Sequence, residues 1–410
     1  MARTSGSPDS GSRSWRRDPR LDVARGLGMF IILIAHIPSN PWANWIPARF
    51  GFSDAAEIFV FCSGLASAIA FGRVFDDAGL LRGSVRIALR IWQVYWAHIG
   101  VFVAIVALMA FADGLLGTDR YLRNELNLGA FLDDPGRRLL GLLTLTYVPN
   151  YFDILPMYLG ILILVPLVLT AERVSLTAAV LLVGGLWVLA ALRLLELPAD
   201  LDTGRPWFFN PFSWQLLFFA GFGLGRGWFR PPGFEPLLVL IALGVIVMAA
   251  PVSCHYGFAC HAAWGTVPWL GEVHRALFPL IDKTHLGIFR VVHFLSLAYL
   301  ASTFVGGRGR ILGGWLGMLR LVGRQTLAVF VAGLWIAQAL GVLLDVTGRT
   351  TMTVTLANVG GCALLVCVAA VVEWVKSPPW SRAPADRAVP ESSASVRRLF
   401  AESCAAPTTR

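Results

Sequence analysis

Residues 234–253 read FEPLLVLIALGVIVMAAPVS, and Glu235 is the only charged residue in this stretch. An α-helix needs about 20 consecutive, mainly apolar residues to cross the hydrocarbon core of a bilayer. In water, the same helix would expose aliphatic side chains on every face. The stretch therefore predicts a membrane-spanning helix.

The rest of the sequence has the same apolar character. Of the 410 residues, 56% are hydrophobic and only 14% are charged, and the mean hydropathy is +0.66. A soluble protein of this length needs more charge to cover its surface. Similar apolar stretches occur at 21–37, 54–72, 91–112, 151–170, 175–195, 207–225, 285–305, 321–344 and 352–375. The sequence predicts an all-α polytopic membrane protein with about ten transmembrane helices.

The position of the charges bears on both topology and function. A net charge of +9 can indicate nucleic-acid binding, but here the charges fall in the loops between apolar stretches, so no nucleic-acid partner is expected. Lys and Arg are more abundant in the loops on the side of the N-terminus. By the positive-inside rule, both termini are expected in the cytoplasm.

The chain divides into one membrane domain and two tails. Residues 1–20 are predicted to be a flexible basic tail, 21–376 the transmembrane domain, and 377–410 a disordered, Pro-rich cytoplasmic tail. The first apolar stretch leads into Pro38 without a small-residue cleavage site, so it is expected to remain as a helix. Residues 139–148 are too short to span and predict a re-entrant or interfacial segment.

Most of the six cysteines are expected to play ordinary roles. Cys62, Cys362 and Cys367 lie in apolar stretches, where a small hydrophobic side chain is usual. Cys254 and Cys260 lie in a loop predicted to be outside, each followed by a histidine. Their spacing matches no standard zinc pattern. A disulfide is therefore favoured over a metal site, and no metal is predicted.

Arg25 and His36 lie on the first predicted helix, eleven residues apart. At 1.5 Å per residue the separation is roughly 16 Å, comparable to an extended pantetheine arm. Arg25 could hold a coenzyme phosphate while His36 acts on the thioester. The alternatives are an interfacial arginine that reaches lipid phosphates and a histidine with a structural hydrogen bond.

Asp54 and Glu57 share one face at the start of the second predicted helix, at about the depth of His36. Glu57 could orient His36 or raise its basicity, as a carboxylate does for a general base. Alternatively, the two acids simply mark a helix start, where negative charge suits the helix dipole.

Arg86 and Arg90 follow the second predicted helix and share a face on the cytoplasmic side. They could bind the phosphates of coenzyme A, although the positive-inside rule alone explains them.

Three further polar residues lie at or within apolar stretches. Asp153 could bind an acceptor hydroxyl, and Arg290 and His293, three residues apart, are expected to face the bundle interior. The sequence has no Gly-x-Ser-x-Gly elbow or Walker loop, which excludes the commoner hydrolases and ATPases.

The combination of these stretches resembles the OpgC family within the membrane acyltransferase-3 superfamily. The stretches that carry the resemblance are 20–27, 35–41, 51–61, 153–158, 210–215, 283–290 and 323–325. The resemblance implies a ten-helix acyltransferase of a bacterial inner membrane, whose intramembrane histidine joins cytoplasmic acyl-CoA to an extracytoplasmic hydroxyl. OpgC-type proteins are linked to succinylation of periplasmic glucans. Arg86 and Arg90 depart from the close double arginine often seen in the superfamily.

The sequence thus predicts O-acyl transfer, with acyl-CoA as donor substrate, no permanently bound cofactor and a periplasmic glucan or other glycan as acceptor. His36 would be the general base, supported by Glu57, and Arg25, Arg86 and Arg90 would hold the coenzyme. The candidate substrate-binding residues are Asp54, Asp153, Arg290 and His293. The alternatives are an organic-anion transporter, weakened by the lack of an evident internal repeat, and a non-catalytic glycan-export partner.

Overall fold

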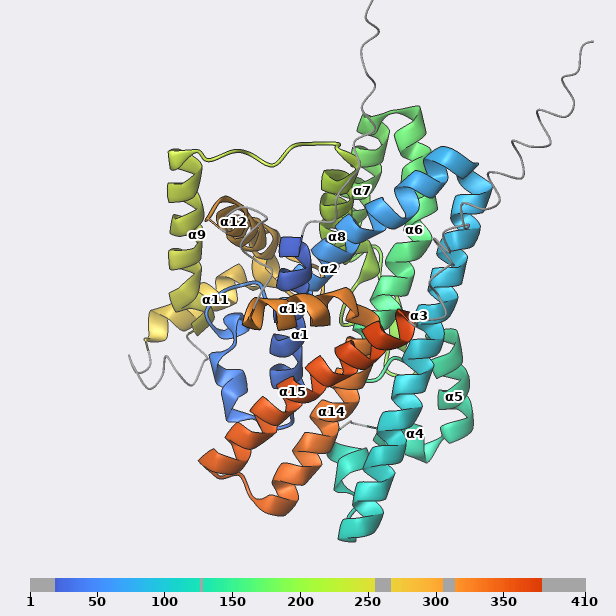
Figure 1. Ribbon diagram of the computed structural model, residues 1–410, viewed down its shortest axis with the longest axis vertical. Helices are drawn as coiled ribbons and strands as arrows, with labels where there is room; N and C mark the ends of the chain where they lie inside the picture. The colour runs from blue at the N-terminus through green and yellow to red at the C-terminus, as the bar shows by residue number, and fades with distance from the viewer. Residues whose placement is uncertain (1–18, 126–127, 255–266, 305–313, 378–410) are drawn as a thin grey trace, which may run out of the picture.

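The computed structural model describes residues 19–125, 128–254, 267–304 and 314–377. Nearly all of the two predicted tails, and Cys260 with its neighbouring histidines, lie outside these ranges. Within the described residues the chain forms a bundle of helices with one short hairpin (Figure 1). The α-helices are α1 (Pro19–His36), α2 (Ala55–Ser67), α3 (Arg73–Leu116), α4 (Gly129–Asp133), α5 (Pro135–Thr144), α6 (Ile154–Val174), α7 (Leu176–Ala191), α8 (Pro211–Arg226), α9 (Pro236–Cys254), α11 (Pro268–Ile281), α12 (Ile288–Phe304), α13 (Trp315–Arg324), α14 (Thr326–Thr347) and α15 (Thr351–Lys376).

Several of these helices are suited to a lipid bilayer. In the described ranges five helical segments are long and apolar enough to cross it: the continuous run Ala55–Leu116, α6, α9, α14 and α15. Two shorter apolar helices, α7 and α12, accompany them. The protein is therefore an integral membrane protein, and the predicted all-α class is confirmed. The count of ten spans and the cytoplasmic position of both termini stay predictions.

The second and third predicted spans belong to one helical run. A π-helical turn, η3 (Ala68–Gly72), joins α2 to α3, so the stretch 73–90, predicted as a connection, is itself largely helical. The run bends at Gly79, whose φ of 82° and ψ of 175° are not helical. Glycine has no Cβ and adopts this conformation without a steric penalty. Arg86 and Arg90 consequently lie on α3, about two and about three turns beyond the bend.

Close backbone contacts fix the two helices that carry the predicted site. A Cβ on Gly26 of α1 would lie 1.9 Å from the Leu319 carbonyl oxygen of α13. A Cβ on Gly64 of α2 would lie 1.8 Å from the Phe218 carbonyl oxygen of α8. Small residues allow helices in membranes to approach this closely, and van der Waals packing then holds them together. The positions of α1 and α2 are set by these contacts.

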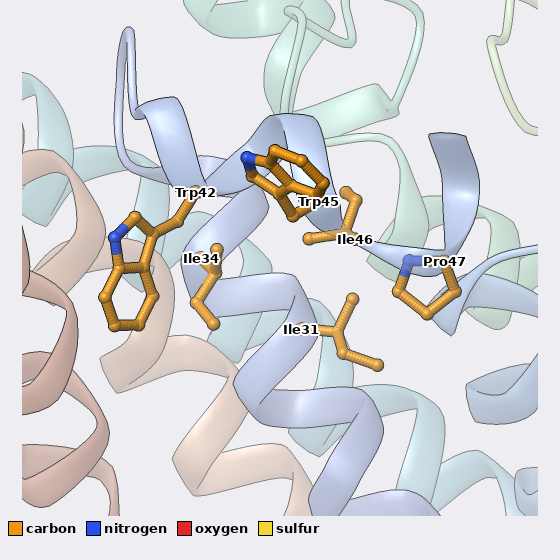
Figure 2. Close-up of a pocket in the computed structure, with 6 residues that line it drawn as sticks. All are labelled: Ile31, Ile34, Trp42, Trp45, Ile46 and Pro47. Atoms are coloured by element: carbon orange, nitrogen blue, oxygen red, sulfur yellow. The ribbon is translucent and has the colours of Figure 1, made fainter. Parts of the chain in front are cut away.

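The segment after α1 turns back along that helix through two 3₁₀ turns, η1 (Pro41–Trp45) and η2 (Pro47–Arg49). Together with α1 they form an open cavity of about 420 Å³ lined by Ile31, Ile34, Trp42, Trp45, Ile46 and Pro47 (Figure 2). The lining residues are uncharged, so this cavity is not suited to bind phosphate or carboxylate groups.

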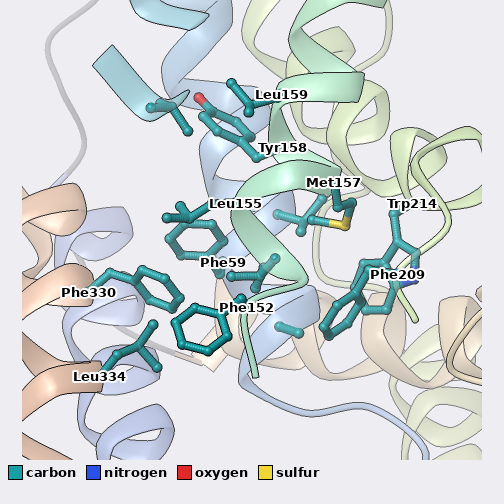
Figure 3. Packing of buried hydrophobic residues seen from close by; sticks show 14 of the residues in the cluster. Phe59, Phe152, Leu155, Met157, Tyr158, Leu159, Phe209, Trp214, Phe330 and Leu334 are labelled. Carbon is teal, nitrogen blue, oxygen red and sulfur yellow. The ribbon is translucent and has the colours of Figure 1, made fainter. Parts of the chain in front are cut away.

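A large buried core joins α2, α6, α8 and α14. Its aromatic side chains meet at short range: the ring centres of Phe59 and Phe330 are 5.9 Å apart (Figure 3). Phe102 of α3 extends the core, with its ring centre 5.2 Å from that of Phe152. Because lipid tails are as apolar as these side chains, the core is stabilised mainly by dense packing rather than by exclusion of water.

The segment 139–148 does not span, as predicted. It falls mostly in α5, a helix of 10 residues. A hairpin of β1 (Pro198–Asp200) and β2 (Arg205–Pro206) packs beside it, where Arg138 forms ion pairs with Asp200 and Asp202. Arg205 also donates a hydrogen bond to the Val148 carbonyl.

Three cysteines, Cys62, Cys362 and Cys367, are free thiols. Cys254 is disulfide-bonded, which agrees with the predicted disulfide over a metal site. Its predicted partner, Cys260, lies outside the described residues.

Candidate active site

Four charged side chains meet where the start of α2 contacts the loop before α12 and the first turn of that helix. Lys283 Nζ lies 2.5 Å from Asp54 Oδ2. Arg290 Nη2 lies 2.6 Å from Glu57 Oε1 and 3.7 Å from Asp54 Oδ2. We call these four residues the charge cluster.

The sequence at the start of α2 explains how the acids are positioned. Asp54 is the N-cap residue, and its side chain accepts a hydrogen bond from Ala56 N at 2.7 Å. Glu57 reaches back to Asp54 N at 2.7 Å, which completes a capping box. The structural alternative for these acids, that they mark the helix start, is therefore correct. It is compatible with a second role, because each acid also contacts a cation.

Lys283 lies in a loop that several hydrogen bonds fix. Asp282 accepts hydrogen bonds from Thr284 N at 3.1 Å and His285 N at 3.3 Å. Trp214 Nε1, from α8, donates to the Lys283 carbonyl at 2.9 Å. The loop therefore presents Lys283 toward α2 with its backbone already ordered.

The charge cluster is largely removed from solvent. Glu57 is 0% exposed and Arg290 is 8% exposed, so an isolated charge at either position would be very costly. The two acids and two cations balance each other. Mutual pairing explains how four charges are tolerated inside an apolar bundle.

His293 lies one turn after Arg290 and extends the cluster. Its Nδ1 lies 2.7 Å from the Ser53 hydroxyl, and a Cβ on Gly51 would come within 2.5 Å of its Nε2. Within the described part of the chain, this buried Nε2 has no hydrogen-bond partner. Arg290 and His293 thus both face the bundle interior, as the sequence predicted.

His36 is the last residue of α1. Its Nδ1 lies 2.7 Å from the Ile32 carbonyl oxygen, an acceptor that fixes the proton on Nδ1. The lone pair of the neutral ring is then on Nε2, as a general base requires. The ring packs edge-on against Tyr151 at 5.9 Å. Lys283 and Asp54 of the charge cluster lie within electrostatic range of the ring.

Glu57 does not provide the orientation of His36 that the sequence suggested. Its carboxylate interacts with Asp54 N and Arg290, and it is the Ile32 carbonyl that orients His36. Any support from Glu57 acts through Arg290 and the other charges of the cluster.

The chain beyond His36 is fixed by the two last helices. Asn40 and Asn358 of α15 exchange hydrogen bonds at 2.8 and 3.0 Å. Arg349 donates to the Pro38 carbonyl at 2.8 Å. These contacts hold the carboxyl end of α1, and hence the His36 backbone, in one position.

The remaining predicted residues lie outside the charge cluster. Arg25 is on α1, eleven residues before His36, so the uninterrupted helix preserves the separation of roughly 16 Å. Arg86 is exposed on α3, and Arg90 contacts Gln93 at 3.3 Å. Asp153 is buried directly before α6, and its Oδ1 has no hydrogen-bond partner among the described residues.

Lys283 and Tyr151 were not singled out as site residues from the sequence. Lys283 lies in a predicted loop between spans, where a charged residue is usual and does not indicate a functional site. Tyr151 adopts a φ of 73°, which is uncommon for a residue other than glycine. No pattern in the sequence predicts this conformation.

The model of the OpgC protein family matches residues 17–377. The chain belongs to the OpgC family. This match includes His36, the charge cluster, and Arg25, Arg86 and Arg90.

A second, local similarity exists. A phospho-N-acetylmuramoyl-pentapeptide-transferase from Desulfatibacillum aliphaticivorans is 36% identical over 118 residues, which are 28% of this OpgC-family chain and 31% of that enzyme. Because the alignment covers less than a third of either protein, it assigns no activity here. No solved structure matches the chain significantly.

Proposed function

We propose that this protein transfers an acyl group, succinyl in particular, from cytoplasmic acyl-CoA to a hydroxyl of a periplasmic glucan. The observation that carries the proposal is the hydrogen bond from His36 Nδ1 to the Ile32 carbonyl, in a chain of the OpgC family. This hydrogen bond leaves Nε2 as the proton acceptor. A neutral imidazole is also the common general base near neutral pH.

The reaction follows from this arrangement. His36 Nε2 accepts the proton of the acceptor hydroxyl while the hydroxyl oxygen attacks the thioester carbonyl carbon. A C–O ester bond forms, the C–S bond breaks, and the thiolate of coenzyme A leaves. The proton on His36 then passes to that thiolate, giving free coenzyme A and restoring the neutral ring.

The donor would be held from the cytoplasmic side. Arg86 and Arg90 lie one turn apart on α3 and present two guanidinium groups suited to the nucleotide phosphates. Arg25, earlier on the His36 helix, would bind the phosphate nearest the pantetheine arm. The helix then spaces this phosphate from His36 by about the length of that arm.

The acceptor would enter from the opposite side. Asp153 is buried and keeps one carboxylate oxygen without a partner in the described structure, which suits it to accept a hydrogen bond from a sugar hydroxyl. Asp54 and His293 are the other groups proposed to contact the acceptor. The membrane would be the bacterial inner membrane.

Purified protein tests this proposal. Full-length protein in detergent, with succinyl-CoA and unsubstituted periplasmic glucan, should release free thiol, and mass spectrometry should find the glucan heavier by one succinyl group. An organic-anion transporter or a non-catalytic export partner would leave the thioester intact. Absence of thiol release in well-folded protein, together with unchanged glycans in cells lacking the gene, would reject acyl transfer.

A further inference from the structure

On the basis of the proposed function, we propose that Lys283 binds a free carboxylate on the acyl group being transferred. Lys283 would thereby select dicarboxylic acyl donors, such as succinyl-CoA, over acetyl-CoA.

The two cations of the charge cluster differ in how they are occupied. Arg290 directs Nε and Nη2 at Glu57, at 2.8 and 2.6 Å, and its Nη2 also approaches Asp54. The Lys283 ammonium has three donors, and Asp54 is its one hydrogen-bond acceptor among the described residues. Its side chain is 31% exposed, compared with 10% for Arg290. Lys283 is therefore the more exposed of the two cations and retains donors for a substrate.

The position of Lys283 fits a short dicarboxylic acyl group. Lys283 and Asp54 lie within electrostatic range of the His36 ring, and we propose that a bound acyl group extends from His36 toward the ammonium. In a succinyl group the free carboxylate carbon lies roughly 4 Å from the thioester carbonyl carbon, at about 1.5 Å per C–C bond. An acetyl group has nothing at that position.

The surroundings of Lys283 strengthen its interaction with an anion. Its Nζ lies 5.9 Å from the ring centre of Phe208 and 5.4 Å from that of Phe209. These rings limit access of water on one side of the ammonium, and charges interact more strongly where water is excluded. Trp187 Nε1 donates to the Leu286 carbonyl at 3.2 Å, which further fixes the loop.

Asp54 allows the exchange of partners that binding requires. When the ammonium turns toward a substrate carboxylate, the Asp54 carboxylate would lose part of the positive charge that neutralises it. Arg290 Nη2 already lies 3.7 Å from the same Asp54 oxygen and can balance it. The cluster thus supports substrate binding by Lys283 without leaving Asp54 as an isolated buried charge.

The test compares donors in full-length protein with unsubstituted periplasmic glucan as acceptor. For wild type, Lys283→Met and Lys283→Arg, kcat/KM is measured with succinyl-CoA and with acetyl-CoA. Lys283→Met should lower the succinyl-to-acetyl ratio about 10- to 100-fold, the loss expected for one charge-assisted hydrogen bond, and Lys283→Arg should restore much of it. The control is Lys376→Met, because Lys376 is the only other lysine in the sequence and pairs with Gln325 instead; its ratio should equal wild type.

A second measurement separates binding from folding. Calorimetric titration without acceptor should show that Lys283→Met weakens succinyl-CoA binding relative to acetyl-CoA binding. If Lys283→Met does not fold, Asp54→Asn/Lys283→Met removes both charges of the pair and should show the same loss of discrimination.

The possible failures are distinct. If wild type consumes neither donor, the proposed function is wrong. Suppose instead that wild type transfers succinyl groups. If Lys283→Met then lowers kcat/KM equally for the two donors, or changes it for neither, Lys283 does not select the acyl group.

Discussion

Arg290 Nη2 lies 2.6 Å from Glu57 Oε1, although 233 residues separate the two in the sequence. Glu57 is fully buried, so the contact cannot be replaced by water. This pair connects α12 to α2 in the interior of the bundle.

Breaking this pair should destabilise the protein. Arg290→Met leaves the Glu57 carboxylate buried without its cation, and such a loss typically costs about 3–5 kcal/mol of unfolding free energy. Adding Glu57→Gln should recover much of the loss, because glutamine keeps the shape and carries no charge. Denaturant unfolding in detergent measures both variants.

The control is Arg324→Met. Arg324 pairs with Glu373 at 2.9 Å but is 40% exposed, so its loss should cost under about 1 kcal/mol. Equal effects of Arg290→Met and Arg324→Met would show that burial of the Glu57 pair contributes nothing.

Replacing His36 should remove catalysis without removing donor binding. His36→Ala should lower acyl transfer by about 10²–10⁴-fold, the usual contribution of a general base, and acyl-CoA affinity should persist because the arginines remain. Thiol release and calorimetry provide the two measurements. His274→Ala, which removes a histidine that contacts the Val252 carbonyl, is the control and should retain transfer. A folded His36→Ala protein with near-normal glucan acylation contradicts the mechanism.

Arg86→Ala/Arg90→Ala should weaken acyl-CoA binding while the thermal unfolding midpoint stays close to wild type. The side chains lie on the outer part of α3, where they stabilise little packing. Arg49→Ala/Arg123→Ala removes two exposed arginines of loops predicted to lie outside, and this control should bind acyl-CoA normally. Unchanged affinity in the first variant, accompanied by poor membrane insertion, would make the arginine pair a topology signal.

The hairpin beside α5 should loosen in acid. Burial alone would raise the pKa of Asp200, but hydrogen bonds from Arg138 and from Asp202 N outweigh it, so the pKa lies below its usual value. A lowered folded-state pKa stabilises the hairpin above the unfolded value of about 3.9, and this contribution is lost as pH falls through the lowered pKa. A spin label at Leu201→Cys should therefore become more mobile below about pH 4.

The matched variant for this experiment is Asp200→Asn with the same label. It should be mobile already at neutral pH and respond less to acid. A label whose mobility does not depend on pH in the native hairpin would contradict the role of the Asp200 carboxylate.

Both termini are predicted in the cytoplasm. A membrane-impermeant maleimide added from the periplasmic side, after reduction, should modify Cys254 or Cys260 but not Cys404. Cys62, Cys362 and Cys367 are replaced by alanine to simplify the readout. Labelling of Cys404 alone would reverse the sidedness of the donor and acceptor sites.

The apolar helices could be predicted from the sequence because a helix that crosses lipid needs a long, continuous run of apolar residues. The stretches predicted at 234–253 and 352–375 correspond to α9 and α15 within two residues. The break at Gln325, which separates α13 from α14, was missed because α13 carries its charges on one face. An amphipathic helix of that kind does not produce a long apolar run.

The candidate active site could be predicted from the sequence only in part. Arg25 with His36, and Asp54 with Glu57, share local helical spacing, so their relations could be read directly. The contact between Lys283 and Asp54 spans 229 residues and depends on how α2 and α12 pack. A single sequence carries no periodic signal for such a contact.

The charge cluster also constrains how the protein is made. Asp54 and Glu57 precede their cations by more than 200 positions, and ribosomes add about 5–20 residues per second. For at least roughly 10 s, each nascent chain therefore carries two acids destined for the membrane interior before any partner for them exists. The insertion machinery, rather than the finished bundle, has to shelter these carboxyl groups. Chains truncated before Lys283 should consequently be substrates for membrane quality-control proteases.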